Sequence, residues 1–413
     1  MELKFKRLKY ACYMTNVSMA VVANMSPLLF LTFREQYGIS YSLLGLLVLV
    51  NFVTQLCIDL IFSFFSHKFN IPLTVKTMPY ITVFGLLIYA LWQFVFPDAV
   101  YAGLVIGTII FSLGSGLAEV LISPTIAAIP ADDPDREMSK LHSVYAWGVV
   151  FFVIIFTLFL QLFGREYWQW MVLFFSLVPI SAAVLFAGAE IPQMETNEKT
   201  SGTLHLLKNP GLWLCFSAIF LGGASEVTMA QWSSGYLEQA LGISKIWGDI
   251  FGVALFAVML GLGRMLYSKI GKNISKALLW GAVGAALCYL TAALCNISFI
   301  GLLACGFTGF CTSMMWPGSL IVASDRFPKG GVFIYAMMAA GGDLGASVGP
   351  QLVGVITDAA LEIPAAINFA AKSGLSPEQL GMKLGMLVGM LFPLLGIAVY
   401  ALIHRSRMNT VKK

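Results

Sequence analysis

Long apolar stretches separated by short polar turns repeat along the whole chain of 413 residues. A helix needs about 20 apolar residues to cross a hydrocarbon core about 30 Å thick. We expect spans at 11–33, 42–65, 77–96, 101–128, 140–162, 168–187, 211–236, 247–267, 277–295, 298–322, 332–357 and 380–403. These runs exceed the roughly ten-residue alternating segments of a membrane β-barrel. The pattern therefore predicts an all-α membrane protein with twelve transmembrane helices.

The composition agrees with a chain that folds in lipid. Hydrophobic residues make up 58% of it and charged residues only 11%, whereas a soluble domain carries roughly 25% charged residues. The seven cysteines all fall within expected spans and form no C-x-x-C pair. We interpret them as small buried apolar residues, with neither disulfide nor metal ligand among them. No cofactor is expected.

Basic residues are distributed unevenly between the two sides of the membrane. With an even number of spans both termini share a side, and 20 of the 25 Lys and Arg residues fall there. The positive-inside rule then predicts cytoplasmic termini in a cell (cytoplasmic) membrane protein. We interpret the basic tail as an orientation signal that contacts lipid headgroups, and a nucleic-acid partner is not expected.

One long polar connection, residues 187–210, divides the chain into six spans (1–186) and six spans (211–413). The halves echo each other at offsets near half the chain length. Phe65-Ser66-His67-Lys68 matches Tyr267-Ser268-Lys269, Ser123-Pro124 matches Trp316-Pro317, and Tyr145-Ala146 matches Tyr335-Ala336. This pattern predicts two six-helix bundles related by a pseudo-two-fold axis along the membrane normal, with a binding site between the halves.

Short motifs carry a resemblance to the major facilitator superfamily. The family's loop after span 2 corresponds here to the degenerate Phe65-Ser66-His67-Lys68-Phe69-Asn70, and the copy after span 8 keeps Gly263-Arg264, Lys269, Gly271 and Lys272. Three stretches resemble the fucose–galactose–glucose:proton symporter branch: Leu141-His142 to Gly148, Glu226 through Trp232 to Tyr236, and Gly341-Gly342-Asp343 to Gly349-Pro350. The resemblance implies a proton-coupled transporter.

Ionisable residues inside the spans are functional candidates because charge is costly in hydrocarbon. Span 2 carries Asn51, Gln55 and Asp59 at i, i+4 and i+8, on one helical face. They line a cavity or form an interhelical hydrogen-bond seam. In span 4, Glu119 follows Gly114-Ser115-Gly116, whose small residues let a neighbouring helix approach.

Burial in hydrocarbon favours the protonated form of Glu119, which would let it load and release protons. His142 early in span 5 and Asp59 late in span 2 can lie at a similar depth, so the three form a candidate proton relay. The alternatives are a fixed structural pair of Glu119 with His142, and a sodium site at Asp59, since hard cations take oxygen ligands. No transition-metal site is expected.

The second half carries candidate substrate contacts. Glu226 lies in the middle of span 7, followed by Gln231 and Trp232, and Asp343 lies in span 11. Carboxylate and amide groups suit sugar hydroxyls, and an aromatic face suits a sugar ring. Trp232 is alternatively a membrane-interface tryptophan. Trp316-Pro317 predicts a bend in span 10. The complete predicted substrate set is Asn51, Gln55, Glu226, Gln231, Trp232, Trp316 and Asp343.

Two absences shape the predicted function. No Lys or Arg lies in the middle of a span, and we expect Arg264, near the inner end of span 8, to extend toward the headgroups. This favours a neutral or cationic solute. The sequence has no phosphate-binding loop and no hydrolase or metalloprotease motif, so it predicts a transporter driven by a gradient and not an enzyme.

The sequence thus predicts a monomeric secondary active transporter that takes up a small neutral polyhydroxylated solute, such as a monosaccharide, with protons. A proton-driven exporter of drugs or other small organic molecules is the main alternative, and a non-transporting scaffold or sensor is another. Outside the spans, Ser376-Pro377-Glu378-Gln379 is typical of a capping box, and 365–372 of a short surface helix.

Overall fold

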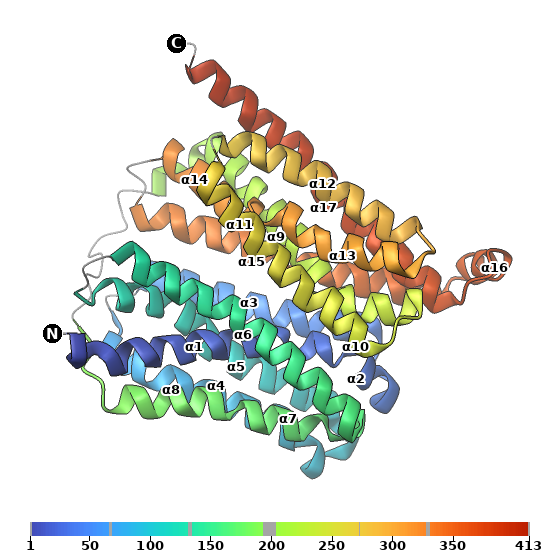
Figure 1. Ribbon diagram of the computed structural model, residues 1–413, viewed down its shortest axis with the longest axis horizontal. Helices are drawn as coiled ribbons and strands as arrows, with labels where there is room; N and C mark the ends of the chain where they lie inside the picture. The colour runs from blue at the N-terminus through green and yellow to red at the C-terminus, as the bar shows by residue number, and fades with distance from the viewer. Residues whose placement is uncertain are drawn as a thin grey trace. The chain divides into compact units, whose positions relative to one another are not determined.

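The computed structural model describes residues 2–65, 68–130, 134–192, 204–271, 273–327 and 331–411. Within these ranges the chain is helical almost throughout (Figure 1). Contacts divide it into two compact units, Met1–Thr32 with Val50–Thr200, and Phe33–Leu49 with Ser201–Lys413. We call them unit 1 and unit 2.

The helices of the first part of the chain are α1 (Glu2–Leu28), α2 (Phe30–Tyr37), α3 (Tyr41–Phe65), α4 (Ile71–Val95), α5 (Val100–Ala127), α6 (Pro134–Phe163), α7 (Trp168–Phe175) and α8 (Leu177–Ala187). Those of the second part are α9 (Pro210–Leu241), α10 (Lys245–Gly248), α11 (Leu255–Ile270), α12 (Ile274–Leu294), α13 (Ser298–Thr312), α14 (Met315–Arg326), α15 (Gly331–Glu362), α16 (Pro364–Lys372) and α17 (Pro377–Val411). A π-helix, Asp249–Ala254, joins α10 to α11, and short 3₁₀ turns lie at Pro97–Ala99, Arg165–Tyr167 and Leu204–Lys208.

Helices occupy every expected span. Ten helical segments of the described chain are long and apolar enough to cross a membrane, and α1 with α2 forms a further span bent by 44°. The fifth expected span lies in α6, whose apolar part is Trp147–Phe163. The predicted all-α multi-pass membrane fold is confirmed. All seven cysteines are free thiols; Cys12, Cys215 and Cys305 are buried as predicted, whereas Cys57 is exposed and the other three are partly exposed.

Capping side chains begin several helices where the sequence changes from polar to apolar. Asn209 accepts a hydrogen bond from the Gly211 amide at 2.8 Å at the start of α9, with Pro210 in the first turn. The predicted capping box of α17 is confirmed: the amide of Ser376 donates to Gln379 Oε1 at 3.0 Å, and the amide of Gln379 donates to Ser376 Oγ at 3.1 Å. The predicted surface helix corresponds to α16.

A side chain distant in sequence caps α3. The Asp358 carboxylate near the end of α15 accepts hydrogen bonds from the amides of Tyr41 and Ser42, at 3.0 and 2.6 Å. The Arg34 guanidinium lies 3.9 Å from the centroid of the Tyr41 ring. A carboxylate at a helix N-terminus satisfies amides that lack an intrahelical acceptor. This contact explains why residues 33–49 group with unit 2.

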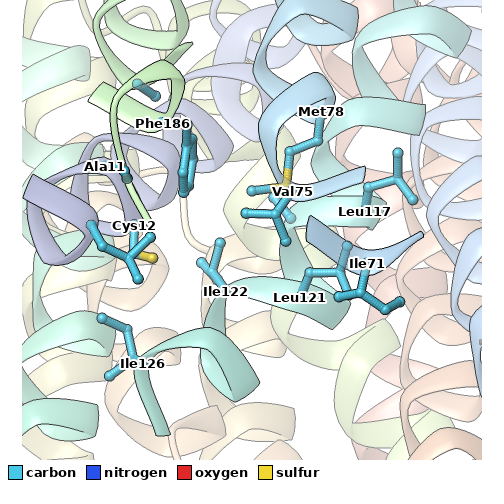
Figure 2. Close-up of a cluster of buried hydrophobic side chains, with 14 of the residues drawn as sticks. Ala11, Cys12, Ile71, Val75, Met78, Leu117, Leu121, Ile122, Ile126 and Phe186 are labelled. Carbon is cyan, nitrogen blue, oxygen red and sulfur yellow. The ribbon is translucent and has the colours of Figure 1, made fainter. Parts of the chain in front are cut away.

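The core of unit 1 is an apolar cluster between α1, α4, α5 and α8 (Figure 2). Cys12, Val75, Met78, Leu121 and Phe186 are among its buried side chains. Leu117 and Leu121 extend from α5 into this cluster, on either side of Glu119 in the sequence. The packing therefore fixes the part of α5 that carries the acid.

Glycines set the distance between α9 and α15 in unit 2. A Cβ atom added to Gly345 would overlap the Phe220 carbonyl oxygen, and one added to Gly349 would overlap the hydroxyl of Thr228. Helices in a bilayer associate through such close packing because lipid supplies no hydrophobic drive between them. The α9–α15 interface is accordingly one of the most extensive in unit 2.

We therefore predict that Gly345→Ala lowers the free energy of unfolding by about 1–3 kcal/mol, because the added methyl group meets backbone and not a movable side chain. Thermal denaturation of the purified protein in detergent measures this change. Gly261→Ala is the matched control, since within the part of the chain that the structure describes a Cβ there meets no atom closer than 4 Å. Equal melting temperatures for the two variants would contradict the prediction.

Candidate functional site

The predicted polar face of α3 is buried in unit 1 against α5. Asn51, Gln55 and Asp59 are all buried. The Ser112 hydroxyl on α5 donates a hydrogen bond to Asn51 Oδ1 at 2.6 Å. One turn further along, a Cβ atom at Gly116 would lie 3.1 Å from the Gln55 Cα. At Asn51 this interface is therefore a hydrogen-bond seam, and at Gln55 it is a close approach of two helix backbones.

The next turn of the same interface brings two acids together. A carboxylate oxygen of Asp59 lies within 4.8 Å of one of Glu119. Two carboxylates that share one site cannot both stay ionised at low cost, so the pair favours holding a proton or a cation between its oxygens. Asp59 is buried, whereas Glu119 retains accessible surface. The pairing of Asp59 with Glu119 follows the arrangement expected from the sequence.

The third member of the predicted relay, His142, lies in helix α6. Its side chain lies outside the described residues, so the acid–acid–imidazole relay stays a prediction. A cavity of about 10 Å³, enough for about one water molecule, lies between α1, α4, α5 and α8. Thr15, Ser18, Thr82 and Ser115 line it, and Ser115 precedes Glu119 by one helical turn.

The second polar cluster lies within unit 2 and begins at a break in the tenth span. Helix α13 ends at Thr312 and α14 starts at Met315, close to the bend expected at Trp316-Pro317. Proline has no amide hydrogen, so Pro317 cannot donate to the Ser313 carbonyl four residues earlier. Arg264 supplies the donor instead, with its Nε 3.1 Å from that oxygen.

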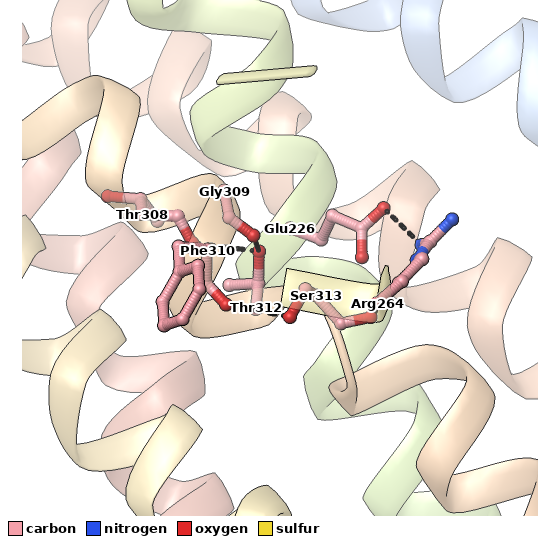
Figure 3. A network of polar contacts seen from close by, with 7 residues as sticks. All are labelled: Glu226, Arg264, Thr308, Gly309, Phe310, Thr312 and Ser313. Atoms are coloured by element: carbon pink, nitrogen blue, oxygen red, sulfur yellow. Dashed lines mark hydrogen bonds and ion pairs between the residues drawn. The ribbon is translucent and has the colours of Figure 1, made fainter. Parts of the chain in front are cut away.

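Arg264 also pairs with the acid of α9 (Figure 3). Its Nη2 lies 3.5 Å from Glu226 Oε1. The other carboxylate oxygen, Oε2, is buried and has no hydrogen-bond partner among the described residues. The Glu226 side chain is 13% exposed and that of Arg264 is 45% exposed. The contact between the two side chains is thus long and monodentate, and the guanidinium is more exposed than the carboxylate.

These contacts of Arg264 are not those expected from the sequence. We expected its side chain to extend toward the headgroups, whereas the structure turns it to Glu226 and Ser313. Gly263 makes the approach feasible, because a Cβ there would overlap the Ser313 hydroxyl. The signal was present in Gly263-Arg264 and Pro317, but it depends on a contact between segments about 50 residues apart.

Trp316 and Asp343 lie next to the same part of α9. A Cβ atom at Gly342 would overlap the Trp316 ring, and one at Gly223 would lie 2.5 Å from the Gly342 carbonyl oxygen. Asp343 is buried. Gly223 precedes Glu226 by one helical turn. Unit 2 therefore brings Glu226, Trp316 and Asp343 to one region of α9.

Trp232 and Gln231 lie further along α9, and both are buried. The Trp232 ring has no exposed surface, and its Nε1–H donates to the Pro350 carbonyl at 2.8 Å. Its ring centroid lies 6.2 Å from that of Tyr41. The structure thus gives Trp232 a role in holding α9 to α15, and substrate contact by Trp232 or Gln231 stays a prediction.

Buried acids on the facing surfaces of membrane-spanning helices are typical of proteins that move solutes or ions across a bilayer. A family model described as Major Facilitator Superfamily matches residues 11–350. The chain belongs to this superfamily. It is accordingly a transporter and not an enzyme.

Solved structures support the fold. A nucleoside transporter has a TM-score of 0.73 at 10% identity, covering 95% of this chain and 98% of its own. A D-xylose–proton symporter has a TM-score of 0.71 at 14% identity, covering 94% and 97%. The Escherichia coli fucose:proton symporter has a TM-score of 0.57 at 13% identity, covering 95% and 99%. A search of curated protein sequences finds no match.

The Glu226–Arg264 contact predicts a specific pattern of stabilities. Each single variant, Glu226→Gln or Arg264→Gln, should lower stability, and Arg264→Gln should lower it more, because it leaves the largely buried carboxylate without its partner whereas Arg264 is 45% exposed. The double variant should be more stable than the sum of the single effects implies, by about 1 kcal/mol of coupling. Thermal unfolding of the four proteins in one detergent measures the cycle. Strictly additive effects would show that the two side chains do not interact.

Proposed function

We propose that this secondary transporter takes up a small polyhydroxylated solute, such as a monosaccharide, together with protons, by alternating access. The observation that carries the proposal is the pair of acids on the α3–α5 interface, within 4.8 Å of each other. A carboxyl pair at this separation changes its total charge by binding one proton, which is the property a coupling site needs.

In this proposal Glu119 and Asp59 hold the coupling proton, with His142 as the third member of the relay. Asn51 and Gln55 on α3 are proposed contacts to the solute in unit 1. Glu226, Gln231, Trp232, Trp316 and Asp343 are those in unit 2. Carboxylate and amide groups suit hydroxyls, and the Trp316 indole suits the apolar face of a sugar ring. Sodium bound at Asp59 and Glu119 is the alternative coupling ion.

Transport of D-xylose and fucose with protons by two proteins of similar fold lends the sugar proposal support, at identities of 14% and 13%. The sequence favoured a neutral or cationic solute because no Lys or Arg lies in the middle of an expected span. This argument about the charge of the solute no longer holds, because the Arg264 guanidinium reaches Glu226. The proposal further places the protein in the cell membrane, as a monomer with cytoplasmic termini.

We predict that Glu119→Gln abolishes uphill accumulation driven by a pH gradient, lowering it at least tenfold, while exchange of solute across the membrane continues. The amide cannot take up and release the coupling proton, but it keeps the size and hydrogen-bonding capacity of the acid. Proteoliposomes with an imposed pH gradient and radiolabelled D-xylose, L-fucose and D-glucose measure both activities.

Asp98→Asn is the matched control in unit 1, because Asp98 is exposed and belongs to the turn before α5. Full accumulation by Glu119→Gln would show that the coupling proton is carried elsewhere. Accumulation that needs a sodium gradient and not a pH gradient would favour the alternative ion. Outward movement of drugs without sugar uptake would favour the exporter.

A further inference from the structure

The Arg264 guanidinium has donors that the protein leaves unused. Nε donates to the Ser313 carbonyl and Nη2 faces Glu226 Oε1. Nη1 has no partner among the described residues. A guanidinium presents its five N–H donors in a planar fork that matches a carboxylate. Arg264 therefore keeps one edge of this fork available for an anionic group.

The space beside Arg264 is open on one side. The side chain is 45% exposed. Gly261 lies one helical turn earlier on α11, and a Cβ atom there would meet no atom of the described residues within 4 Å. A bulkier residue at this position would project into the open space next to the arginine. The local geometry thus leaves room for a ligand group, in contrast to Gly263, which is in tight contact with Ser313.

The contact with Glu226 does not use the full binding capacity of Arg264. Strong arginine–carboxylate pairs are bidentate, with N···O distances of about 2.7–2.9 Å, whereas this contact is single and 3.5 Å long. The Ser313 carbonyl, left without its helical donor by Pro317, holds the guanidinium in place independently of Glu226. Arg264 is therefore positioned even when its partner acid changes.

We infer that Arg264 binds a carboxylate on the transported solute, so that the substrate is a monocarboxylated polyol such as a hexuronic or aldonic acid. This inference rests on the proposed transport function and narrows its substrate class. Arg264 supplies the charge that recognises the acid, and Glu226 repels it. The neighbouring hydroxyl-binding groups recognise the remainder of the molecule.

The two charged residues then have opposite effects on binding, which a purely structural ion pair would not show. Arg264→Gln removes the binding charge and should weaken D-glucuronate binding at least tenfold. Glu226→Gln removes a like charge next to the ligand carboxylate and should strengthen the same binding severalfold. If Glu226 and Arg264 only stabilise the fold, both substitutions weaken binding.

The test is calorimetric or thermal-shift titration of the purified full chain with D-glucuronate, D-gluconate and lactate, and with D-glucose as the neutral analogue of glucuronate. The matched control is Arg405→Gln, since Arg405 is exposed near the end of α17. Arg264→Lys keeps the charge but not the fork, and should bind acids more weakly than the parent. It also provides a second variant if Arg264→Gln does not fold.

The inference is supported if the parent protein binds one of the acids tightly, Arg264→Gln no longer binds it, and Glu226→Gln binds it more tightly than the parent. Binding of D-glucose with none of the acids bound, or weaker acid binding in Glu226→Gln, overturns it. Proton-driven sugar uptake that persists unchanged in Arg264→Gln leaves the proposed function standing while the inference fails. Absence of any proton-driven solute uptake, in contrast, overturns the proposed function itself.

Discussion

A polar group in the hydrocarbon core of a bilayer has no water to bind, so the protein must satisfy it. In unit 2 this constraint connects four residues through successive contacts. Pro317 deprives the Ser313 carbonyl of its helical donor, Arg264 supplies the replacement, and Glu226 faces the charge that Arg264 brings into the membrane. Pro317 is thus needed to explain both the position of the arginine and the cost of burying the acid.

Close packing is what makes these contacts feasible. Gly263 lets α11 approach the break after α13, Gly116 lets α5 approach α3, and Gly345 lets α15 approach α9. Each glycine lies within a few residues of a polar side chain that the packing positions. In lipid, small residues do more than permit helix association, because the same short distances decide which polar groups meet.

The features that the sequence predicts well are periodic or local. The i, i+4, i+8 spacing of Asn51, Gln55 and Asp59 required one buried face, and the capping box at Ser376 is a four-residue pattern. The partner of Glu226 could not be predicted in this way. It lies 38 residues away on α11, a helix that follows a π-helical turn at Asp249–Ala254, and periodicity within α11 does not reveal that turn.

The two units differ in how they compensate an acid within a membrane span. Unit 1 places Asp59 beside a second carboxylate, so its charge is most easily reduced by a proton or a small cation. Unit 2 places Glu226 beside a guanidinium, whose positive charge partly offsets that of the carboxylate. An acid that already has a basic partner gains less from protonation than an acid that faces another acid. In the proposed mechanism the coupling ion therefore belongs to the α3–α5 pair, and the charge of the solute is selected at Arg264.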